Sequence, residues 1–390
     1  MKWKFYSLAF VAGMSILTAC SSDDNNDNDG NGGNGNGNEI ENGTILKGTI
    51  TSDVTLAAGN TYKLSGEYIV EEGATLHIEE GVKIIAVYDD IADYILVKQG
   101  GKINAVGTPD KPIVMTSEKE EPGAWGGIHI CGRAHTNAEG GKGSSEIGGA
   151  VYGGNDDADN SGTLQYIRLE YTGFAFDEEH EANGISFYSV GNGTIVDHCQ
   201  AYKGSDDGFE FFGGSVNVSN LVAVSCSDDS FDWTEGWNGK GTNLVAYQEA
   251  ESTLGYDCDC LMECDNNGSN NAATPVAHPV LKNLILVGNG GSKQGIRLRA
   301  GTEVEIDNAK VCGKGQPLTV ETALTENALK NGTSKLTNIT LTSELSCKEG
   351  IYTHADFIAV TSNKVDANLS YSSFEDIRKE CSWMNGSWVK

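Results

Sequence analysis

A six-residue motif occurs twice in this chain, and the offset of 22 residues from one copy to the next limits what the chain can fold into. The motif reads Ser-Asp-Asp-Gly-Phe-Glu at residues 205–210 and Ser-Asp-Asp-Ser-Phe-Asp at residues 227–232. About 22 residues make one turn of a parallel β-helix, so we expect the two copies on neighbouring rungs. Adjacent strands lie roughly 4.8 Å apart, which brings the acids of both copies into one patch.

The patch would hold six carboxylates: Asp206, Asp207, Glu210, Asp228, Asp229 and Asp232. Two unit charges roughly 4.8 Å apart repel each other by about 3.5 kcal/mol at an effective dielectric constant of about 20. A cation, an arginine or bound protons must therefore neutralise the patch.

A longer repeat surrounds the motif. Seven segments share a pattern of apolar residues around a polar third position, and they start at Leu164, Ile195, Val218, Gly241, Leu281, Ile306 and Leu336. The starts lie 23 to 40 residues apart, which indicates a base period of about 23 with insertions. Five segments carry asparagine at the third position: Asn220, Asn243, Asn283, Asn308 and Asn338. Stacked asparagines at a turn predict a structural ladder of hydrogen bonds.

Short alternating strands and glycine-rich turns extend this pattern over most of the chain. Fifty glycines and six prolines favour a turn-rich, all-β body. The sequence thus predicts a right-handed parallel β-helix over residues 44–345, a solenoid with a small C-terminal cap over residues 346–390. In that cap we expect Trp383 and Trp388 to cover the last open rung and a Cys347–Cys381 disulfide to fix it.

The N-terminus has a different character. Residues 1–19 have a basic start, an apolar stretch and the ending Leu-Thr-Ala before Cys20, which resembles a bacterial lipoprotein signal peptide with Cys20 as the lipidated residue. Residues 20–43 are mostly Ser, Asp, Asn and Gly and predict a disordered tether. The acidic run after Cys20 resembles the export signal of Bacteroidetes lipoproteins. That resemblance implies an outer-membrane protein anchored by lipid and facing the cell exterior.

Charge and cysteine content narrow the partners. Residues 1–19 hold two lysines and no acid, so their removal changes the net charge from −28 to −30, which makes nucleic acid a poor partner. Of ten cysteines, nine remain after Cys20, and an exported protein is expected to form disulfides among them, with at least one thiol left free or buried because nine is odd. The group Cys258, Cys260 and Cys264 is included in that expectation.

The acidic motif resembles the calcium site of the family 9 pectate lyases, which are right-handed parallel β-helices. The resemblance covers about thirty residues and rests on Asp206-Asp207 followed by Asp228-Asp229-x-x-Asp232. It implies that these acids bind Ca²⁺, a cation that takes six to eight oxygen ligands. The family's catalytic lysine has no counterpart at the expected place. The nearest following basic residues are Lys282, Lys293, Arg297 and Arg299. The offset of Arg297 within its repeat is close to that of the acidic column, which makes it a candidate counter-ion of that column or a base.

Three interpretations of the patch remain open: a calcium site, an acidic stripe neutralised by arginine or solvent, and a lyase centre. Trp233 and Trp237 are candidates for stacking on sugar rings. A second resemblance, to Bacteroidetes β-helix lipoproteins of undefined activity, rests on segments such as Pro122-Gly-Ala-Trp-Gly-Gly and Val151-Tyr-Gly-Gly-Asn-Asp.

The leading hypothesis is a surface lipoprotein that binds a glycan on a calcium-braced acidic face and assists uptake through an outer-membrane transporter. The alternatives are a calcium-dependent lyase of an acidic polysaccharide and a structural or adhesive stalk.

Overall fold

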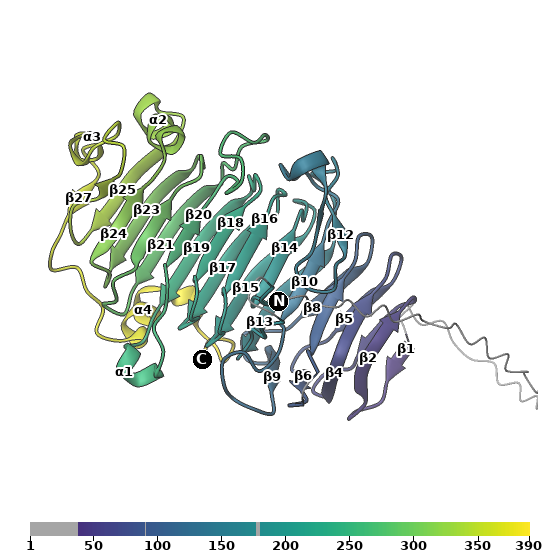
Figure 1. The fold of residues 1–390 in the computed structure, drawn as a ribbon. Helices are drawn as coiled ribbons and strands as arrows, with labels where there is room; N and C mark the ends of the chain where they lie inside the picture. Colours follow the sequence, from purple (N-terminus) through teal and green to yellow (C-terminus); the bar gives the residue numbers. More distant parts are fainter. Residues whose placement is uncertain (1–37, 90, 177–179) are drawn as a thin grey trace, which may run out of the picture. The chain divides into compact units, whose positions relative to one another are not determined.

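The computed structural model describes residues 38–89, 91–176 and 180–390. Twenty-five strands form one sheet, and every pair of neighbouring strands in it is parallel. The sheet winds into a β-helix, so the predicted all-β solenoid is confirmed (Figure 1). Cys20 and the signal peptide lie outside the described residues, as does most of the predicted tether.

Ten strands build the first turns of the β-helix, and all but β4, with ten residues, are short. These strands are β1 (Asn38–Ile40), β2 (Ile45–Ile50), β3 (Val54–Leu56), β4 (Thr61–Val70), β5 (Thr75–Ile78), β6 (Lys83–Ala86), β7 (Tyr94–Val97), β8 (Lys102–Val106), β9 (Ile113–Ser117) and β10 (Ile128–Cys131). Strand β1 pairs with β3, so residues 38–40, which the sequence assigns to the tether, belong to the solenoid. Residues 41–43 form the turn between β1 and β2.

From residue 162 onward each turn has a long strand and a short one. The long strands are β13 (Gly162–Glu170), β15 (Ile195–Tyr202), β17 (Asn217–Val224), β19 (Lys240–Tyr247), β21 (Val280–Val287), β23 (Glu305–Cys312) and β25 (Lys335–Leu341), and the two-residue β27 (Lys364–Val365) ends their stack. The short strands are β14 (Ile185–Tyr188), β16 (Phe209–Phe212), β18 (Phe231–Thr234), β20 (Met262–Cys264), β22 (Gln294–Leu298), β24 (Gln316–Val320) and β26 (Ser346–Cys347). Each stack pairs in sequence order, one rung upon the next.

The long strands bend at the residue that the repeat predicts. All five asparagines there have positive φ, between 55° and 64°. Asparagine tolerates this left-handed conformation better than most residues. The amide of Asn243 donates to Asn220 at 2.8 Å and accepts from Asn283 at 3.0 Å, and Asn308 continues the series at 2.9 Å. The predicted ladder is thereby confirmed for four of the five asparagines, whereas the amide of Asn338 donates to Asp307 Oδ1 at 2.7 Å instead.

One rung of the repeat is displaced from the sequence alignment. Leu164 pairs with Val196 and not with Ile195, so the residue at the bend of β15 is His198. Asp197 sits beside the ladder instead and accepts from the amide of Asn220 at 2.7 Å. The carboxylate thus ends a series of amides, because it can accept but cannot donate.

The interior of the β-helix is apolar and contains stacked aromatic rings. Phe187 stacks on Phe211 with ring centroids 5.0 Å apart, and Phe209 stacks on Phe231 at 5.6 Å. These rings occupy inward positions of the short strands, so the residues between them must point outward. That alternation positions the site described below.

Two segments leave the coil. Residues 132–161 form an excursion that contains the turn η1 (Glu139–Gly141) and an antiparallel pair, β11 (Gly143–Ser144) with β12 (Val151–Tyr152). The second excursion precedes β20 and carries α1 (Glu251–Leu254). The other helices are α2 (Ala323–Asn331), α3 (His354–Ala359), α4 (Phe374–Glu380) and η2 (Ser382–Met384).

The C-terminal region differs from the predicted cap. Strands β26 and β27 carry the sheet past residue 345. Phe357 of α3 packs into the main core near its end. By contrast Trp388 stacks edge-on against His198 of β15, far from the last rung, with ring centroids 5.2 Å apart. The expectation that Trp383 and Trp388 cover the open end is therefore wrong: this segment runs back over the outer face of the long strands.

The predicted disulfides are absent as well. All nine cysteines in the described part of the chain are free thiols, Cys347 and Cys381 included. Most are buried and serve as small apolar residues. No helix among the described residues is long and apolar enough to cross a membrane.

Candidate functional site

The repeated motif lies on the outer side of the short strands, as the register shows. Phe209 pairs with Phe231, which places Glu210 beside Asp232. The next rungs continue this column, since Asp232 pairs with Glu263 and Glu263 pairs with Arg297. The column starts from the neutral Ser186 on the preceding rung.

Two further columns lie in the turns that lead into these strands. Counting back from the paired strand residues, one reads Ala182, Asp206, Asp228, Asp259, Lys293 and the other reads Asn183, Asp207, Asp229, Cys260, Gln294. Backbone hydrogen bonds between the turns support this alignment, for example Ser227 N to Gly204 O at 3.0 Å and Asp259 N to Ser227 O at 3.1 Å. All three columns thus change from neutral through acidic to neutral or basic along the solenoid.

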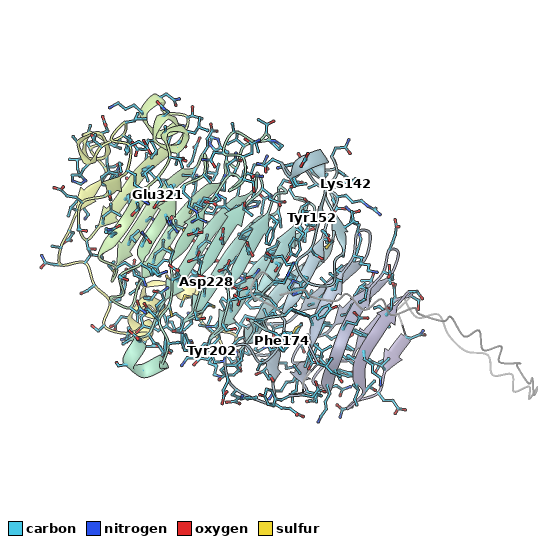
Figure 2. The ribbon with its side chains drawn as sticks, in the orientation of Figure 1. Lys142, Tyr152, Phe174, Tyr202, Asp228 and Glu321 are labelled. Carbon is cyan, nitrogen blue, oxygen red and sulfur yellow. The ribbon has the colours of Figure 1, made fainter. Side chains whose placement is uncertain are left out.

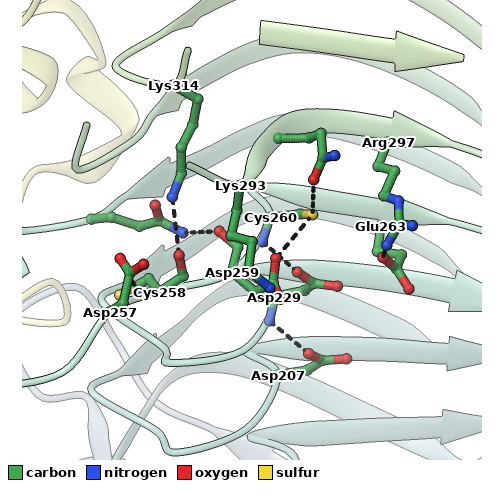
Figure 3. Close-up of polar contacts among 12 residues, drawn as sticks. Asp207, Asp229, Asp257, Cys258, Asp259, Cys260, Glu263, Lys293, Arg297 and Lys314 are labelled. Carbon is green, nitrogen blue, oxygen red and sulfur yellow. Dashed lines mark hydrogen bonds and ion pairs between the residues drawn. The ribbon is translucent and has the colours of Figure 1, made fainter. Parts of the chain in front are cut away.

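The backbone of each rung binds the carboxylate of the rung before it. The amide N–H of Asp229 donates to Asp207 Oδ1 at 2.8 Å, and that of Cys260 donates to Asp229 Oδ1 at 2.6 Å (Figure 3). These bonds hold both side chains in fixed positions, with exposed fractions of 6% for Asp207 and 4% for Asp229.

The columns enclose a cleft of about 380 Å³. Ten carboxylates and one guanidinium line it: Glu146, Glu181, Asp206, Asp207, Glu210, Asp228, Asp229, Asp232, Asp259, Glu263 and Arg297. Figure 2 shows Asp228 over the teal strands in the middle of the β-helix. All six residues predicted from the motif therefore line one cleft, together with four acids from elsewhere in the chain.

Burial and mutual repulsion raise the pKa values of these acids. Desolvation, followed by the charge of Asp228, raises the pKa of Asp206 to about 8. Desolvation also raises the pKa of Asp228 to about 6, with the charge of Asp259 as the next largest cause. The pKa values of Asp207, Glu210, Asp229 and Asp232 lie well above the ordinary range for the same two reasons, burial first. Without a cation the cleft would retain protons near neutral pH.

Three cations neutralise the end of the cleft that faces the C-terminus. Lys293 pairs with Asp259 at 2.5 Å. Arg297 pairs with Glu263 at 2.8 Å, and Arg299 contacts the same carboxylate. Arg297 also reaches Glu321, 3.2 Å away. The third acidic rung is thus satisfied by the chain itself (Figure 3).

These ion pairs bear on the two roles considered for Arg297. Burial acts to lower the pKa of Arg297, but the hydrogen bond to Glu321 and the charge of Glu263 outweigh it, and the pKa lies above its ordinary value. A guanidinium held in this way cannot accept a proton at neutral pH. Arg297 is the counter-ion of Glu263 and Glu321.

The first two acidic rungs have no such partner. Among the described residues, no ion pair reaches any of the six motif acids. The amide of Asn183 donates to Glu210 Oε2 at 2.6 Å, whereas its own Oδ1 atom is buried without a hydrogen-bond partner in the described structure. Asp232 Oδ1 is in the same state. Buried oxygens without donors are the kind of group that binds a cation.

The acids form groups whose geometry suits metal ions. In four sets of three residues, one ligand atom from each residue lies within 4.8 Å of the other two: Asp206–Asp207–Asp228, Asp207–Glu210–Asp232, Asp229–Asp232–Glu263 and Asp229–Asp259–Cys260. The first three sets offer oxygen alone, which fits a hard cation such as Ca²⁺ and not a thiolate-seeking one.

The chain matches the family model described as a pectate-lyase-like β-helix domain over residues 48–389. It belongs to this family. No curated protein and no solved structure matches the chain significantly. Membership fixes the architecture, while the acids found in the cleft have to be interpreted from this chain's own geometry.

The aromatic residues of this pectate-lyase-like β-helix are mostly internal. Trp233 and Trp237 are each 1% exposed, and the rings of Phe211 and Trp237 stack with centroids 4.1 Å apart inside the coil. The prediction that Trp233 and Trp237 stack on sugar rings is wrong. Phe176, by contrast, is 41% exposed and packs edge-on against Phe174 with ring centroids 5.2 Å apart.

Sequence reasoning missed the third acidic rung. Residues 258–263 read Cys-Asp-Cys-Leu-Met-Glu, a degenerate third copy of the motif, and residues 292–297, Ser-Lys-Gln-Gly-Ile-Arg, form a fourth copy with basic residues. An offset of 31 residues, caused by the excursion with α1, hides the third copy. The pattern acid-x-x-x-acid at Asp259 and Glu263 was the available signal.

Proposed function

We propose that this β-helix binds a glycan through Ca²⁺ held in the acidic cleft. One observation carries the proposal: six buried or half-buried carboxylates on two adjacent rungs form no ion pair with the described chain, while the third rung pairs with three cations. Removing charges from water without a counter-charge is costly, so a bound cation stabilises this arrangement. Ca²⁺ fits the oxygen-only groups.

A glycan is the ligand class that suits such a site. Ca²⁺ keeps coordination positions for hydroxyl or carboxylate oxygens of a ligand, since it takes six to eight oxygens. The cleft is open and almost wholly polar, which favours a hydroxyl-rich ligand over an apolar one. At a net charge of −28 the protein repels polyanions, so an acidic glycan would depend on the bound cation for its contact.

We further propose that the protein works at the cell surface, anchored in the outer membrane through Cys20 and serving an uptake system. The support is the sequence of residues 1–43, with its apolar stretch, its cysteine and its acidic tether. A glycan held outside the cell is a substrate for import, which makes an outer-membrane transporter the fitting partner.

Cleavage of an acidic polysaccharide is the second candidate, favoured by membership of the pectate-lyase-like family. β-Elimination needs a base next to the calcium. Burial lowers the pKa of Lys314, yet this lysine is 4% exposed and donates to Cys258 O and Asn289 Oδ1, outside the cleft lining (Figure 3). Lys293 and Arg297 are both paired. Binding therefore accounts for the site better than catalysis.

The test measures retention of the protein on a glycan array and on immobilised polygalacturonate. One arm contains CaCl₂ and the other contains a chelator. Binding that disappears with chelator and in Asp229→Asn/Asp232→Asn supports the proposal; equal retention in both arms, or none, refutes it. An absorbance assay for unsaturated uronate on the same polysaccharides separates the two candidates, because a binding protein generates no such product. In a structural stalk the double variant would change stability alone.

A further inference from the structure

We propose that the acidic cleft binds two cations and not one, with Asp207 as the ligand shared between them. The proposal deepens the calcium-dependent function above and rests on it. We call Asp206, Asp207 and Asp228 the turn site, and Asp207, Glu210 and Asp232 the strand site. Each is a set of three carboxylates whose ligand atoms lie within 4.8 Å of one another.

The two sites point to separate ions because their ligands lie on different parts of the rung. The turn-site acids stand in the turns that precede β16 and β18, whereas Glu210 and Asp232 are neighbours on the outer face of those strands. No single set with mutual distances under 4.8 Å contains both Asp228 and Asp232 among the described residues. One ion at either site would therefore leave the carboxylates of the other site without a cation.

The charge of the cleft leads to the same conclusion. The six motif acids carry six negative charges when ionised, and no ion pair from the described residues offsets them. One divalent ion would leave four of these charges in a largely buried cleft, while two ions would leave two. Water at the opening of the cleft, or a polar ligand, can stabilise two remaining negative charges more easily than four.

An independent observation points to a ligand at the strand site. Asn183 is 1% exposed, and its side chain enters this site, because its Nδ2 atom lies 2.6 Å from Glu210 Oε2. Its Oδ1 atom has no hydrogen-bond partner in the described structure, and neither has the buried Asp232 Oδ1. A buried acceptor without a donor is costly, and an amide oxygen, like a carboxylate oxygen, is an ordinary ligand of Ca²⁺.

The third acidic rung does not provide a further site of this kind. Glu263 also lies close to Asp229 and Asp232, but its carboxylate already contacts Arg297 and Arg299. Lys293 forms an ion pair with Asp259 and neutralises it in the same way. The cations of the chain thus end the series of metal sites after the second rung.

Native mass spectrometry of the full chain, stripped with chelator and titrated with CaCl₂, counts the ions. We expect two bound Ca²⁺. Glu210→Gln should retain only the turn-site ion and Asp228→Asn only the strand-site ion. Asp207→Asn should weaken both by about tenfold or more. The matched control is Glu39→Gln, which removes an exposed acid on β1 and should bind two ions.

A count of one ion in the unsubstituted chain overturns this inference and leaves the calcium-dependent function standing, whereas a count of zero overturns both. Loss of both ions in Glu210→Gln and in Asp228→Asn, each folded by circular dichroism, also overturns it, because independent sites would not vanish together. The variants are expected to fold, since each removes one negative charge from a repulsive cluster.

Discussion

The asparagine ladder and the acidic columns are built by the same device, in which one type of residue recurs at one register position on successive rungs. In the ladder, Asn243 donates to Asn220 and accepts from Asn283, so the stack satisfies itself. In the columns, Glu210 stands beside Asp232 and neither can donate. Repetition in a solenoid thus lets amides satisfy one another, whereas it places carboxylates side by side without donors, so the acidic stack has to retain protons or bind a cation.

The largest effect expected from this difference is a pH dependence confined to the acidic columns. An unfolded aspartate titrates near pH 3.9, whereas Asp206 in the folded protein has a pKa of about 8. Between these values the folded protein binds more protons than the unfolded chain. The free energy of unfolding in chelator should therefore fall as the pH rises from 4 to 8, by up to about 1.4 kcal/mol per pH unit for each such acid.

Urea unfolding at each pH from 5 to 8 measures this dependence. Asp206→Asn should flatten the profile, and saturating Ca²⁺ should flatten it further, since the ion replaces the protons. A stability that rises with pH in chelator would show that the acids are already neutralised by the chain, and the contrast with the asparagine ladder would fail.

The second prediction is stabilisation by calcium itself. An ion that binds only the folded chain adds about 2.7 kcal/mol at a free concentration one hundred times its Kd. The thermal unfolding midpoint at pH 7.5 should rise by several degrees between chelator and millimolar CaCl₂. MgCl₂ at the same concentration is the control and should do less, because Mg²⁺ demands tighter octahedral geometry. No shift with either ion would refute the prediction.

The third prediction places a carboxylate in the ladder. Asn243→Asp keeps the size of the side chain but removes the donor to Asn220 Oδ1, so two acceptors would face each other. We expect a loss of about 2 kcal/mol at pH 8, measured by urea unfolding and partly recovered at pH 4, where the new aspartate carries a proton. Asn243→Gly is the matched control, because glycine tolerates the positive φ of 60° but forms neither hydrogen bond.

Asn243→Asp should be less stable than the glycine variant at pH 8. If the two variants are equally stable, the ladder contributes no direction-dependent hydrogen bonding, and its role reduces to the backbone conformation at the bend.

Much of the acidic site follows from the sequence, and the reason is periodicity. Two copies of a motif 22 residues apart suffice to predict that Asp206 and Asp228 meet, because parallel rungs leave no other register. The alternation of side chains along a strand also predicts the orientation of Trp233. Asp232 faces outward, so Trp233, its neighbour on β18, has to face inward, and the predicted sugar contact was excluded by the same rule.

Other features depend on contacts that periodicity does not encode. The excursion before β20 displaces the third acidic rung by 31 residues, and only the pairing of Asp232 with Glu263 restores the alignment. The path of the C-terminal segment depends on apolar residues on the outer face of the long strands, such as Val222 and Ile285. In the sequence these residues look like ordinary strand residues. Side-chain pairing of cysteines requires distances, and the sequence supplies only their number.

The smallest predicted effect is the reverse exchange, an amide placed in the acidic column. Asp232→Asn removes one charge from the cleft and gives the neighbouring Glu210 a possible donor, where the buried Asp232 Oδ1 now has no partner. In chelator we expect this variant to be more stable than the unsubstituted chain by about 1 kcal/mol, measured by urea unfolding. In saturating Ca²⁺ the order should invert, because a ligand has been lost. Asp110→Asn, an exposed position away from the cleft, should leave stability unchanged in both conditions. If Asp232→Asn is less stable than the unsubstituted chain in chelator, the Asp232 carboxylate is already satisfied within the folded chain, as the amides of the ladder are. The ladder and the acidic column would then differ in residue type, but neither would need a bound cation.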